Sequence, residues 1–342
     1  MELLSIDIFS GCGGLTEGMH QASFKTKIAF EIDEIASTAY RVNHPGTTVI
    51  TKDIRDVSIT EIKEKLNGQT IHLLAGCPPC QGFSKMRTLN KLIPVDDERN
   101  GLIMEYVRLV RELMPYTIMM ENVPGLVNYD LFKKAISILQ DELKYKVDFK
   151  VVNVKDYGVP QSRKRLVLVG SRLGKIKVAE GTNKRKTVRD AISHLPNPKK
   201  SRDQLHKIFP SHTHEVQERI KLTPKNGGGR KDLPKRFKLK CHEGKNIGFN
   251  DVYGRLRWDD FSTTITGGCL NPSKGRFLHP QQNRCISARE AALLQSFPAK
   301  YKFPTDISRG RLALLIGNAL PPAFSYIQSA NIRKHILEHL GK

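Results

Sequence analysis

The chain has 342 residues, enough for one large or two modest domains, and its 39% hydrophobic and 26% charged residues are ordinary for a globular protein. No run approaches 18 uninterrupted apolar residues, and Glu2 and Asp7 interrupt the apolar N-terminal segment, so neither a membrane span nor a signal peptide is expected. Six cysteines without a dense framework favour a reducing, cytoplasmic setting.

The net charge of +22 is concentrated in the second part of the chain. Residues 1–150 carry 18 Lys and Arg against 20 Asp and Glu, whereas residues 151–342 carry 38 against 14. A surface that is merely solvated mixes the two signs. The asymmetry therefore favours a small-molecule domain joined to a surface that binds a polyanion, with nucleic acid as the best candidate.

The first predicted element is a strand over 3–9, apolar enough to be buried on both faces. It runs into Ser10-Gly11-Cys12-Gly13-Gly14 and then into a helix over 15–21. A strand, a glycine-rich turn and a helix open a nucleotide-type βαβ unit, in which glycines let a cofactor approach the backbone. The spacing G-x-G-G falls short of the full dinucleotide fingerprint, so the turn alone is weak evidence.

Acidic residues end the next two predicted strands, 27–30 and 48–52, in Glu31-Ile32-Asp33 and in Asp53. A carboxylate at the tip of the second strand is placed to accept hydrogen bonds from ribose hydroxyls, although Asp33 equally suits the cap of a helix over 34–42. A glycine loop and acids at one sheet edge suggest an adenosine-containing cofactor. The missing G-x-x-x-x-G-K-[ST] motif argues against a nucleoside triphosphate.

An apolar run over 71–75 breaks at Gly76 into Cys77-Pro78-Pro79-Cys80. The two prolines fix φ and remove two backbone donors, so the strand cannot continue, and the loop carries Cys80 past the carboxyl end of a buried strand. Cys80 is therefore a candidate nucleophile. This stretch alone leaves three alternatives open: half of a zinc site, a thioredoxin-like redox pair, and small buried hydrophobes. No second Cys/His pair with ligand spacing follows, so we predict no metal site.

A polar connection over 85–100, long enough for a mobile lid, leads to a helix over 102–113 and a strand over 115–120. Glu121-Asn122 follows at the tip of that strand, at the same sheet edge as Cys80. A glutamate beside an apolar run can hold a proton at neutral pH, although structural loop hydrogen bonds are an equal alternative.

A helix over 131–143 and strands over 146–154 and 165–170 come next. Arg163 and Arg165 alternate along an extended segment just before the last of these strands, so both should point to one side. Paired guanidinium groups suit phosphate or carboxylate recognition, although a run of charge is usually just a solvated face.

Between 170 and 286 the periodic signal fades, and Lys, Arg, Pro, Gly and Asn dominate. Such a stretch is typical either of disorder or of a small irregular domain, and scattered large apolar side chains favour the folded domain. These anchors are Phe209, Phe237, Phe249, Tyr253, Leu256, Trp258, Phe261 and Phe277.

Two helices are predicted near the end of the chain, over 287–295 and over 323–340, the first with Ser287 as its cap and Glu290 at the capping-box position. The terminal helix should pack back on the N-terminal sheet. The expected catalytic domain is therefore discontinuous, 1–180 completed by 308–342, with a basic domain inserted at 181–307.

Six motifs occur in an order that resembles the bacterial DNA (cytosine-5)-methyltransferases over essentially the whole chain. They are Asp7-Ile8-Phe9-Ser10-Gly11-Cys12-Gly13-Gly14, Gly76-Cys77-Pro78-Pro79-Cys80-Gln81-Gly82-Phe83-Ser84, Glu121-Asn122-Val123, Gln161-x-Arg163-x-Arg165, Arg289-Glu290-Ala291 through Gln295-Ser296-Phe297-Pro298, and Gly317-Asn318-Ala319. The resemblance implies an α/β fold, a Rossmann-like doubly wound sheet with an inserted, smaller and irregular recognition domain.

The resemblance also implies S-adenosyl-L-methionine as cofactor and S-adenosyl-L-homocysteine as product. Glu31 would bind the ribose hydroxyls, and Asp53 the adenine amino group. The other implied cofactor residues are Phe9, Ser10, Gly11, Gly13, Gly14, Ile32, Ile54, Pro79, Leu102 and Asn318.

For catalysis, the resemblance implies Cys80 as nucleophile and Glu121 at the cytosine N3 edge. Arg163 and Arg165 would hold Glu121, the base and its phosphate. The implied DNA-binding residues are Gln81, Ser84, Arg163, Thr264, Thr266 and Gly267.

The expected function is methylation of C5 of a flipped-out cytosine within a specific short sequence of double-stranded DNA, through a covalent bond between Cys80 and C6. We expect a monomeric modification enzyme of a restriction-modification system in the bacterial cytoplasm or nucleoid, with a cognate endonuclease that acts separately. Two alternatives are an RNA (tRNA) cytosine-5 methyltransferase and a catalytically inactive DNA-binding module.

Overall fold

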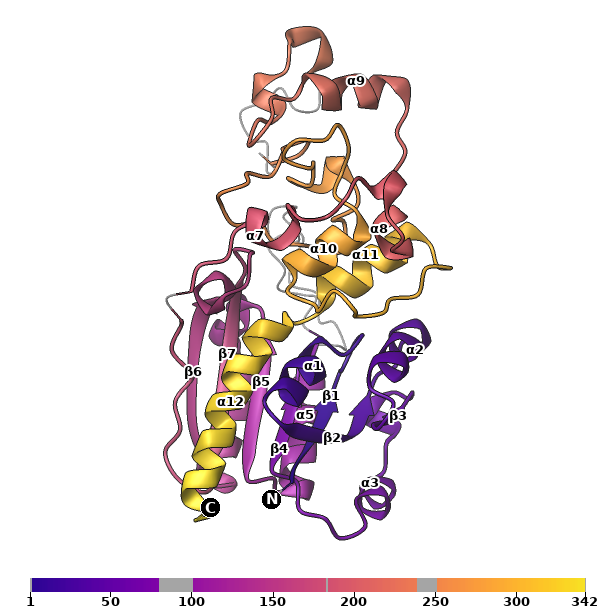
Figure 1. Ribbon diagram of the computed structural model, residues 1–342. Helices are drawn as coiled ribbons and strands as arrows, with labels where there is room; N and C mark the ends of the chain where they lie inside the picture. Colours follow the sequence, from indigo (N-terminus) through magenta and orange to yellow (C-terminus); the bar gives the residue numbers. More distant parts are fainter. Residues whose placement is uncertain (1, 80–100, 183, 239–250, 342) are drawn as a thin grey trace. The chain divides into compact units, whose positions relative to one another are not determined.

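The computed structural model describes residues 2–79, 101–182, 184–238 and 251–341 (Figure 1). The predicted lid over 85–100 and the anchor Phe249 lie outside these ranges. The chain divides into two compact units. Unit 1 comprises Met1–Val154, Lys164–Gly181 and Leu320–Lys342, and unit 2 comprises Lys155–Arg163 and Thr182–Ala319. The segment 308–319, which the sequence groups with the catalytic domain, thus belongs to unit 2.

Unit 1 is built on a seven-stranded sheet in the order β3-β2-β1-β4-β5-β7-β6 (Figure 1). The five strands from β3 to β5 are parallel to their neighbours, whereas β7 runs antiparallel to both β5 and β6. The strands are β1 (Leu3–Ile8), β2 (Phe24–Phe30), β3 (Thr48–Ile50), β4 (Leu73–Gly76), β5 (Thr117–Asn122), β6 (Lys146–Asn153) and β7 (Lys164–Ser171).

Helices cover both faces of this sheet, as its doubly buried strands require. Within the described residues, the helices of unit 1 are α1 (Gly14–Gln21), α2 (Glu34–Asn43), α3 (Ile59–Leu66), α5 (Leu102–Leu113), α6 (Asp130–Ser137) and α12 (Pro322–His339). Short 3₁₀ turns span Ile54–Asp56 and Pro124–Asn128, and a π-helical turn, Ile138–Glu142, follows α6. The single helix predicted over 131–143 is therefore two consecutive pieces.

The period-two alternation of a strand decides what each face of β1 contacts. Leu4, Ile6 and Ile8 join the hydrophobic core that α5 and α6 complete. On the opposite face, the carboxyl group of Asp7 accepts a hydrogen bond from the hydroxyl of Thr16 in α1, at 2.6 Å. The same strand therefore anchors an apolar core and a buried polar group.

The terminal helix α12 lies beside α1 on one face of the sheet (Figure 1). Ser325 donates a hydrogen bond from its hydroxyl to the carbonyl of Leu15, at 2.7 Å. The two helices approach so closely that a Cβ added to Gly18 would lie 2.4 Å from Cβ of Ser325. The C-terminal helix thus packs on α1 and belongs to the same compact unit as the N-terminal strand.

Unit 2 has little regular structure in its described residues, in keeping with its turn-rich sequence. Its helices are α7 (Val188–Ile192), α8 (Gln204–Lys207), α9 (His214–Leu222), α10 (Ala288–Leu294) and α11 (Arg309–Asn318). Its described 3₁₀ turns are Pro198–Lys200, Arg230–Asp232, Lys235–Phe237 and Pro272–Lys274, and a further 3₁₀ turn, Val154–Tyr157, begins at the border of the two units along the chain.

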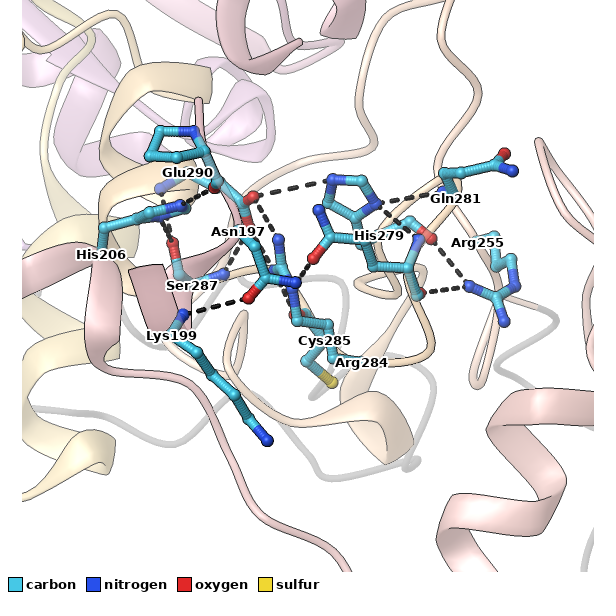
Figure 2. Close-up of polar contacts among 12 residues, drawn as sticks. Asn197, Lys199, His206, Arg255, His279, Gln281, Arg284, Cys285, Ser287 and Glu290 are labelled. Carbon is cyan, nitrogen blue, oxygen red and sulfur yellow. Dashed lines mark hydrogen bonds and ion pairs between the residues drawn. The ribbon is translucent and has the colours of Figure 1, made fainter. Parts of the chain in front are cut away.

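In unit 2, buried side chains form hydrogen bonds with backbone carbonyls that have no partner strand. Arg255 is fully buried, and its guanidinium donates to the carbonyls of Ile220, Thr223, His279 and Gln282 and to Oδ1 of Asn283. Burial lowers the pKa of His279 to about 4, so its ring is neutral, and its Nδ1 accepts from the backbone N–H groups of Gln281 and Gln282 (Figure 2).

A buried ion pair fixes the start of α10. Arg284 binds both carboxylate oxygens of Glu290, each at 2.7 Å (Figure 2). Glu290 also accepts from the backbone N–H of Ser287, whose hydroxyl accepts from the N–H of Glu290. The capping box predicted for Ser287 and Glu290 is therefore confirmed, and a 2.7 Å contact between Ser287 Oγ and His206 Nδ1 ties it to α8.

The described helices include none with the length and apolarity needed to cross a bilayer.

Candidate active site

The glycine-rich turn after β1 has a backbone that only certain residues can adopt. Phe9, Gly11 and Gly13 have φ angles of 59°, 54° and 92°. Positive φ is easy for glycine but costly for phenylalanine, so Phe9 marks strain of the kind that collects at ligand sites. A Cβ built on Gly11 would meet no described atom within 4 Å, so this turn faces open space. Ser10 is buried and donates its N–H to the carbonyl of Phe30, and Gly14 begins α1.

Glu31 is held beside this turn by two backbone donors. Its Oε2 accepts from the N–H of Gly11 at 2.7 Å, and its Oε1 accepts from the N–H of Asp33 at 2.9 Å. Burial raises the pKa of Glu31 above its ordinary value, and the two hydrogen bonds partly oppose that rise. Asp33 itself caps α2 by accepting from the N–H of Ala36, so the capping alternative is confirmed for this residue.

The neighbouring predicted cofactor residues differ in exposure. Ile32 is 64% exposed directly after Glu31, although it is a large apolar residue. Ile54 and Leu102 are buried in the core, and Leu102 is the first residue of α5. Asp53 caps the 3₁₀ turn Ile54–Asp56, and its carboxylate binds Arg55 through two oxygens, which lowers its pKa. Asp53 is thus already paired with a cation.

Glu121 lies inside β5 rather than in the loop after it, because β5 extends to Asn122. It pairs with Val167 of the antiparallel strand β7. Its carboxylate is buried, and Oε1 lies 2.6 Å from Nε of Arg165 near the start of β7. The ion pair brings together two residues that the sequence placed in one site.

The loop that carries Cys77 and Pro79 is tied to the same strand. Asn122 donates from Nδ2 to the carbonyl of Pro78, at 2.9 Å. Burial and the nearby carboxylate of Glu121 raise the pKa of the Cys77 thiol well above its ordinary value. Because redox-active pairs depend on a thiolate, a thiol held protonated in this way does not favour the redox alternative. Cys80, Gln81 and Ser84 lie outside the described residues.

Arg163 lies in unit 2 and is 4% exposed. One guanidinium nitrogen donates to the carbonyl of Ile265 at 3.1 Å and to that of Gly317 at 2.7 Å. The segments that carry predicted DNA-binding and cofactor residues therefore meet at this side chain. Arg163 and Arg165 have different partners in the structure.

Around Arg163, the other predicted residues of unit 2 vary in exposure. Thr264 donates its hydroxyl to the carbonyl of Ser162, at 2.9 Å, and Thr266 is exposed. A Cβ on Gly267 would lie 2.5 Å from Leu314. Asn318 is exposed as the last residue of α11. Their contacts with DNA or cofactor stay predictions.

Three polar residues of this region received no individual role from the sequence. Asn122 holds the Pro78 carbonyl, Asp7 is fully buried, and Gln295 is fully buried near Gly317. All three belong to quoted motifs, so the signal was present. The partners of Asn122 and Gln295 are distant in sequence, so the sequence alone does not reveal the roles of these two residues.

Together, the mixed sheet with parallel strands β1 to β5, the glycine turn and the acidic strand end define a Rossmann-like methyltransferase fold. The model of the family described as C-5 cytosine-specific DNA methylase matches residues 3–334. The chain belongs to this family, and it is a DNA (cytosine-5)-methyltransferase. The resemblance seen in the six motifs is thereby confirmed.

Relatives match over nearly the full length. A Type II methylase, M.HgiDII of Herpetosiphon aurantiacus, is 34% identical over 97% of this chain and 95% of its own. The Type II methyltransferase M1.HphI of Haemophilus parahaemolyticus is 33% identical over 94% of this chain and 84% of its own.

Solved structures agree. A crystal structure described as a DNA modification methyltransferase encoded within an E. coli prophage superposes with a TM-score of 0.75, at 26% identity over 97% of this chain and 99% of that one. The S. pombe Dnmt2 methyltransferase shares the fold at 18% identity, with a TM-score of 0.67 and full coverage of both chains.

Neither of the two alternatives, an RNA (tRNA) cytosine-5 methyltransferase and a catalytically inactive DNA-binding module, is favoured by the family match and the Type II relatives.

Proposed function

We propose that Cys80, Glu121, Arg163 and Arg165 perform the methylation and that the methyl donor is S-adenosyl-L-methionine. The observation that supports this assignment is the buried ion pair of Glu121 and Arg165, 2.6 Å apart. A buried carboxylate oriented by a guanidinium is suited to a fixed hydrogen bond with a substrate. Arg165 would orient Glu121 toward the cytosine N3 edge, and Arg163 would hold the base and its phosphate.

In this mechanism Cys80 adds as a thiolate to C6 of the flipped cytosine, while Glu121 supplies a proton or hydrogen bond at N3. The electron pair displaced from the C5–C6 double bond makes C5 nucleophilic, and C5 takes the methyl group. A solvent base then takes the C5 proton, the electron pair re-forms the C5–C6 double bond, and the bond from C6 to the Cys80 sulfur breaks to release the thiolate. A proton supplied at N3 returns to Glu121, which restores the ring. S-adenosyl-L-methionine supplies an electrophilic methyl on a sulfonium sulfur, and S-adenosyl-L-homocysteine leaves.

Residues at the end of β1 and β2 fit an adenosyl group. The turn at Gly11 faces open space, and the carboxylate of Glu31 beside it is fixed by two backbone N–H groups. The exposed side chain of Ile32 offers an apolar surface for an adenine ring. We assign the ribose hydroxyls to Glu31. We assign the adenine amino group to Asp53, whose carboxylate would accept a hydrogen bond from it while still paired with Arg55.

The remaining cofactor contacts would come from Phe9, Ser10, Gly13, Gly14, Ile54, Pro79, Leu102 and Asn318.

Cys80→Ala tests the assignment directly. Methyl transfer from tritiated S-adenosyl-L-methionine to unmethylated plasmid DNA should fall to background, and DNA that contains 5-fluorocytosine should no longer be trapped covalently. Cofactor binding by calorimetry serves as the control, because this variant should bind S-adenosyl-L-methionine as wild type does. Wild-type transfer by Cys80→Ala would refute the mechanism.

Its relatives' description as Type II enzymes supports a role as the modification enzyme of a restriction-modification system. We propose that the protein acts as a cytoplasmic monomer on a short double-stranded site that a separate endonuclease also recognises. The DNA contacts would come from Gln81, Ser84, Arg163, Thr264, Thr266 and Gly267. Bisulfite sequencing of DNA from expressing cells should find one methylated sequence. Binding to DNA should weaken steeply with salt, because phosphate contacts release counterions.

A further inference from the structure

Gln161 and Gln295 form a fully buried amide pair in unit 2. Both side chains have zero exposure, and Nε2 of Gln161 donates to Oε1 of Gln295 at 2.6 Å. Burying an amide is costly unless its polar atoms find partners, so a pair of this kind is informative about what it holds. The two residues come from distant parts of the chain, Gln161 from the segment before β7 and Gln295 from the end of α10.

The remaining amide atoms bind backbone groups of two further segments. Oε1 of Gln161 accepts from the N–H of Ile265 at 2.8 Å. Nε2 of Gln295 donates to the carbonyl of Ile316 at 2.6 Å and lies 3.3 Å from that of Gly317. The amide pair therefore links the segment 263–267 to the turn 316–319.

Arg163 binds the same two segments. Its guanidinium donates to the carbonyl of Ile265 and to the carbonyl of Gly317. Both peptides therefore form hydrogen bonds with Arg163 and with the amide pair. The two backbones are in direct contact, because a Cβ on Gly317 would lie 2.2 Å from the carbonyl carbon of Thr266. The direction of the Arg163 guanidinium thus depends on the distance between the Ile265 and Gly317 peptides, which Gln295 helps to set.

We propose that Gln295 is a positioning residue for Arg163. Without touching the substrate, it binds the Gly317 carbonyl directly and the Ile265 peptide through Gln161, and so sets the separation of the two carbonyls that orient the guanidinium. It also holds the turn that contains Asn318. The inference rests on the proposed role of Arg163 in binding the target nucleotide. Loss of Gln295 should therefore act on methyl transfer only while Arg163 is present.

A double-mutant cycle separates positioning from mere structure. The variants are Gln295→Met, which keeps the side-chain length without the amide, Arg163→Ala, and the two combined. Gln328→Met is the matched control, because Gln328 is also fully buried and accepts a hydrogen bond from a backbone N–H, that of Ala179, but in unit 1. The readouts are kcat and KM for unmethylated plasmid DNA and the thermal midpoint of each variant.

We expect Gln295→Met to lower kcat/KM for DNA at least tenfold in the wild-type background and less than twofold in the Arg163→Ala background. Gln328→Met should lower the thermal midpoint by a similar amount and leave kcat/KM within twofold of wild type. Equal losses from Gln295→Met in both backgrounds would overturn the proposal, and so would wild-type kcat/KM in that variant.

A different result would contradict the proposed function itself. If Arg163→Ala had wild-type activity, Arg163 would have no role in methyl transfer, whatever the effect of Gln295→Met. If Gln295→Met does not fold, Gln295→Glu replaces it, since it keeps the shape and removes the amide donor. Its kcat/KM relative to wild type should rise at least threefold as pH falls from 8 to 6, because a protonated carboxyl can again donate to the Ile316 carbonyl. A flat ratio would overturn the proposal.

Discussion

Nε of Arg165 lies 2.6 Å from Oε1 of Glu121, and the two residues stand on adjacent antiparallel strands with side chains 15% and 9% exposed. A buried pair of this kind has two separable consequences. Removing one partner leaves an uncompensated charge, which costs stability, whereas removing the carboxylate also takes away the group proposed to act at N3.

Glu121→Gln should lower kcat by about 10²- to 10⁴-fold, the range for loss of a positioned acid or base. Arg165→Met should lower the free energy of unfolding by about 3 kcal/mol or more, because Glu121 would stay buried without its cation. The double variant, Glu121→Gln with Arg165→Met, should recover much of that free energy of unfolding, because no unpaired charge is left buried, but it should not recover activity. Urea unfolding and tritium transfer measure the two effects. Full activity in the double variant would contradict the role of Glu121.

Gly317→Ala should be severely destabilising. The added Cβ would lie 2.2 to 2.4 Å from backbone atoms of Thr266 and Gly267, which cannot move as a flexible side chain can. We expect a loss of at least about 2 kcal/mol in the free energy of unfolding. Gly310→Ala in the same helix is the control, because its Cβ would meet nothing nearer than Ser308 Oγ at 4.0 Å. It should be neutral or stabilise by up to about 1 kcal/mol. Equal effects of the two changes would refute the close approach.

Asp7 predicts a specific pH dependence of stability. Burial raises its pKa from 3.8 to about 8, so the native state binds a proton that the unfolded chain has released. The stabilisation is fully present below about pH 4 and is lost as pH rises toward 8, by up to about 1.4 kcal/mol per pH unit. Asp7→Asn should flatten this slope, because an amide stays neutral and can still accept from Thr16. Parallel curves for the two proteins, from urea unfolding between pH 4 and 9, would contradict the assignment.

The pair of Arg284 and Glu290 should matter to stability far more than an exposed pair. Glu290→Gln removes a charge from a bidentate contact whose side chains are 9% and 1% exposed, and should cost about 3 kcal/mol or more. Asp130→Asn breaks the ion pair with Lys133, whose side chains are 96% and 67% exposed, and should cost less than about 1 kcal/mol. Thermal midpoints compare them, and similar losses would be inconsistent with a structural role for the buried pair.

Local features of the fold were predictable because their causes are local. The helix over 102–113 follows from its apolar periodicity, and the caps at Asp33 and Ser287 follow from side chains that bond their own helix starts. The glycine turn after β1 also lies where the sequence predicted it.

Features that depend on distant partners were not predictable in the same way. Glu121 was expected in a loop but lies in β5, because the pairing with β7 extends that strand. The motifs implied a link between Glu121 and Arg165, but only the antiparallel pairing supplies the distance. Arg163 and Gln295 donate to the backbone carbonyls of Gly317 and Ile316, and a backbone carbonyl carries no sequence signal.

The antiparallel alignment of β5 with β7 has a consequence for folding as well as for chemistry. Glu121 sits opposite Val167, two positions beyond Arg165, so a slip of β7 by one residue would turn the arginine toward the other face of the sheet. That misaligned sheet would bury a cation with no anion beside it. The salt bridge therefore stabilises the native register relative to the shifted one. A chain that lacks the charge pair would discriminate less strongly between the two registers as the sheet assembles.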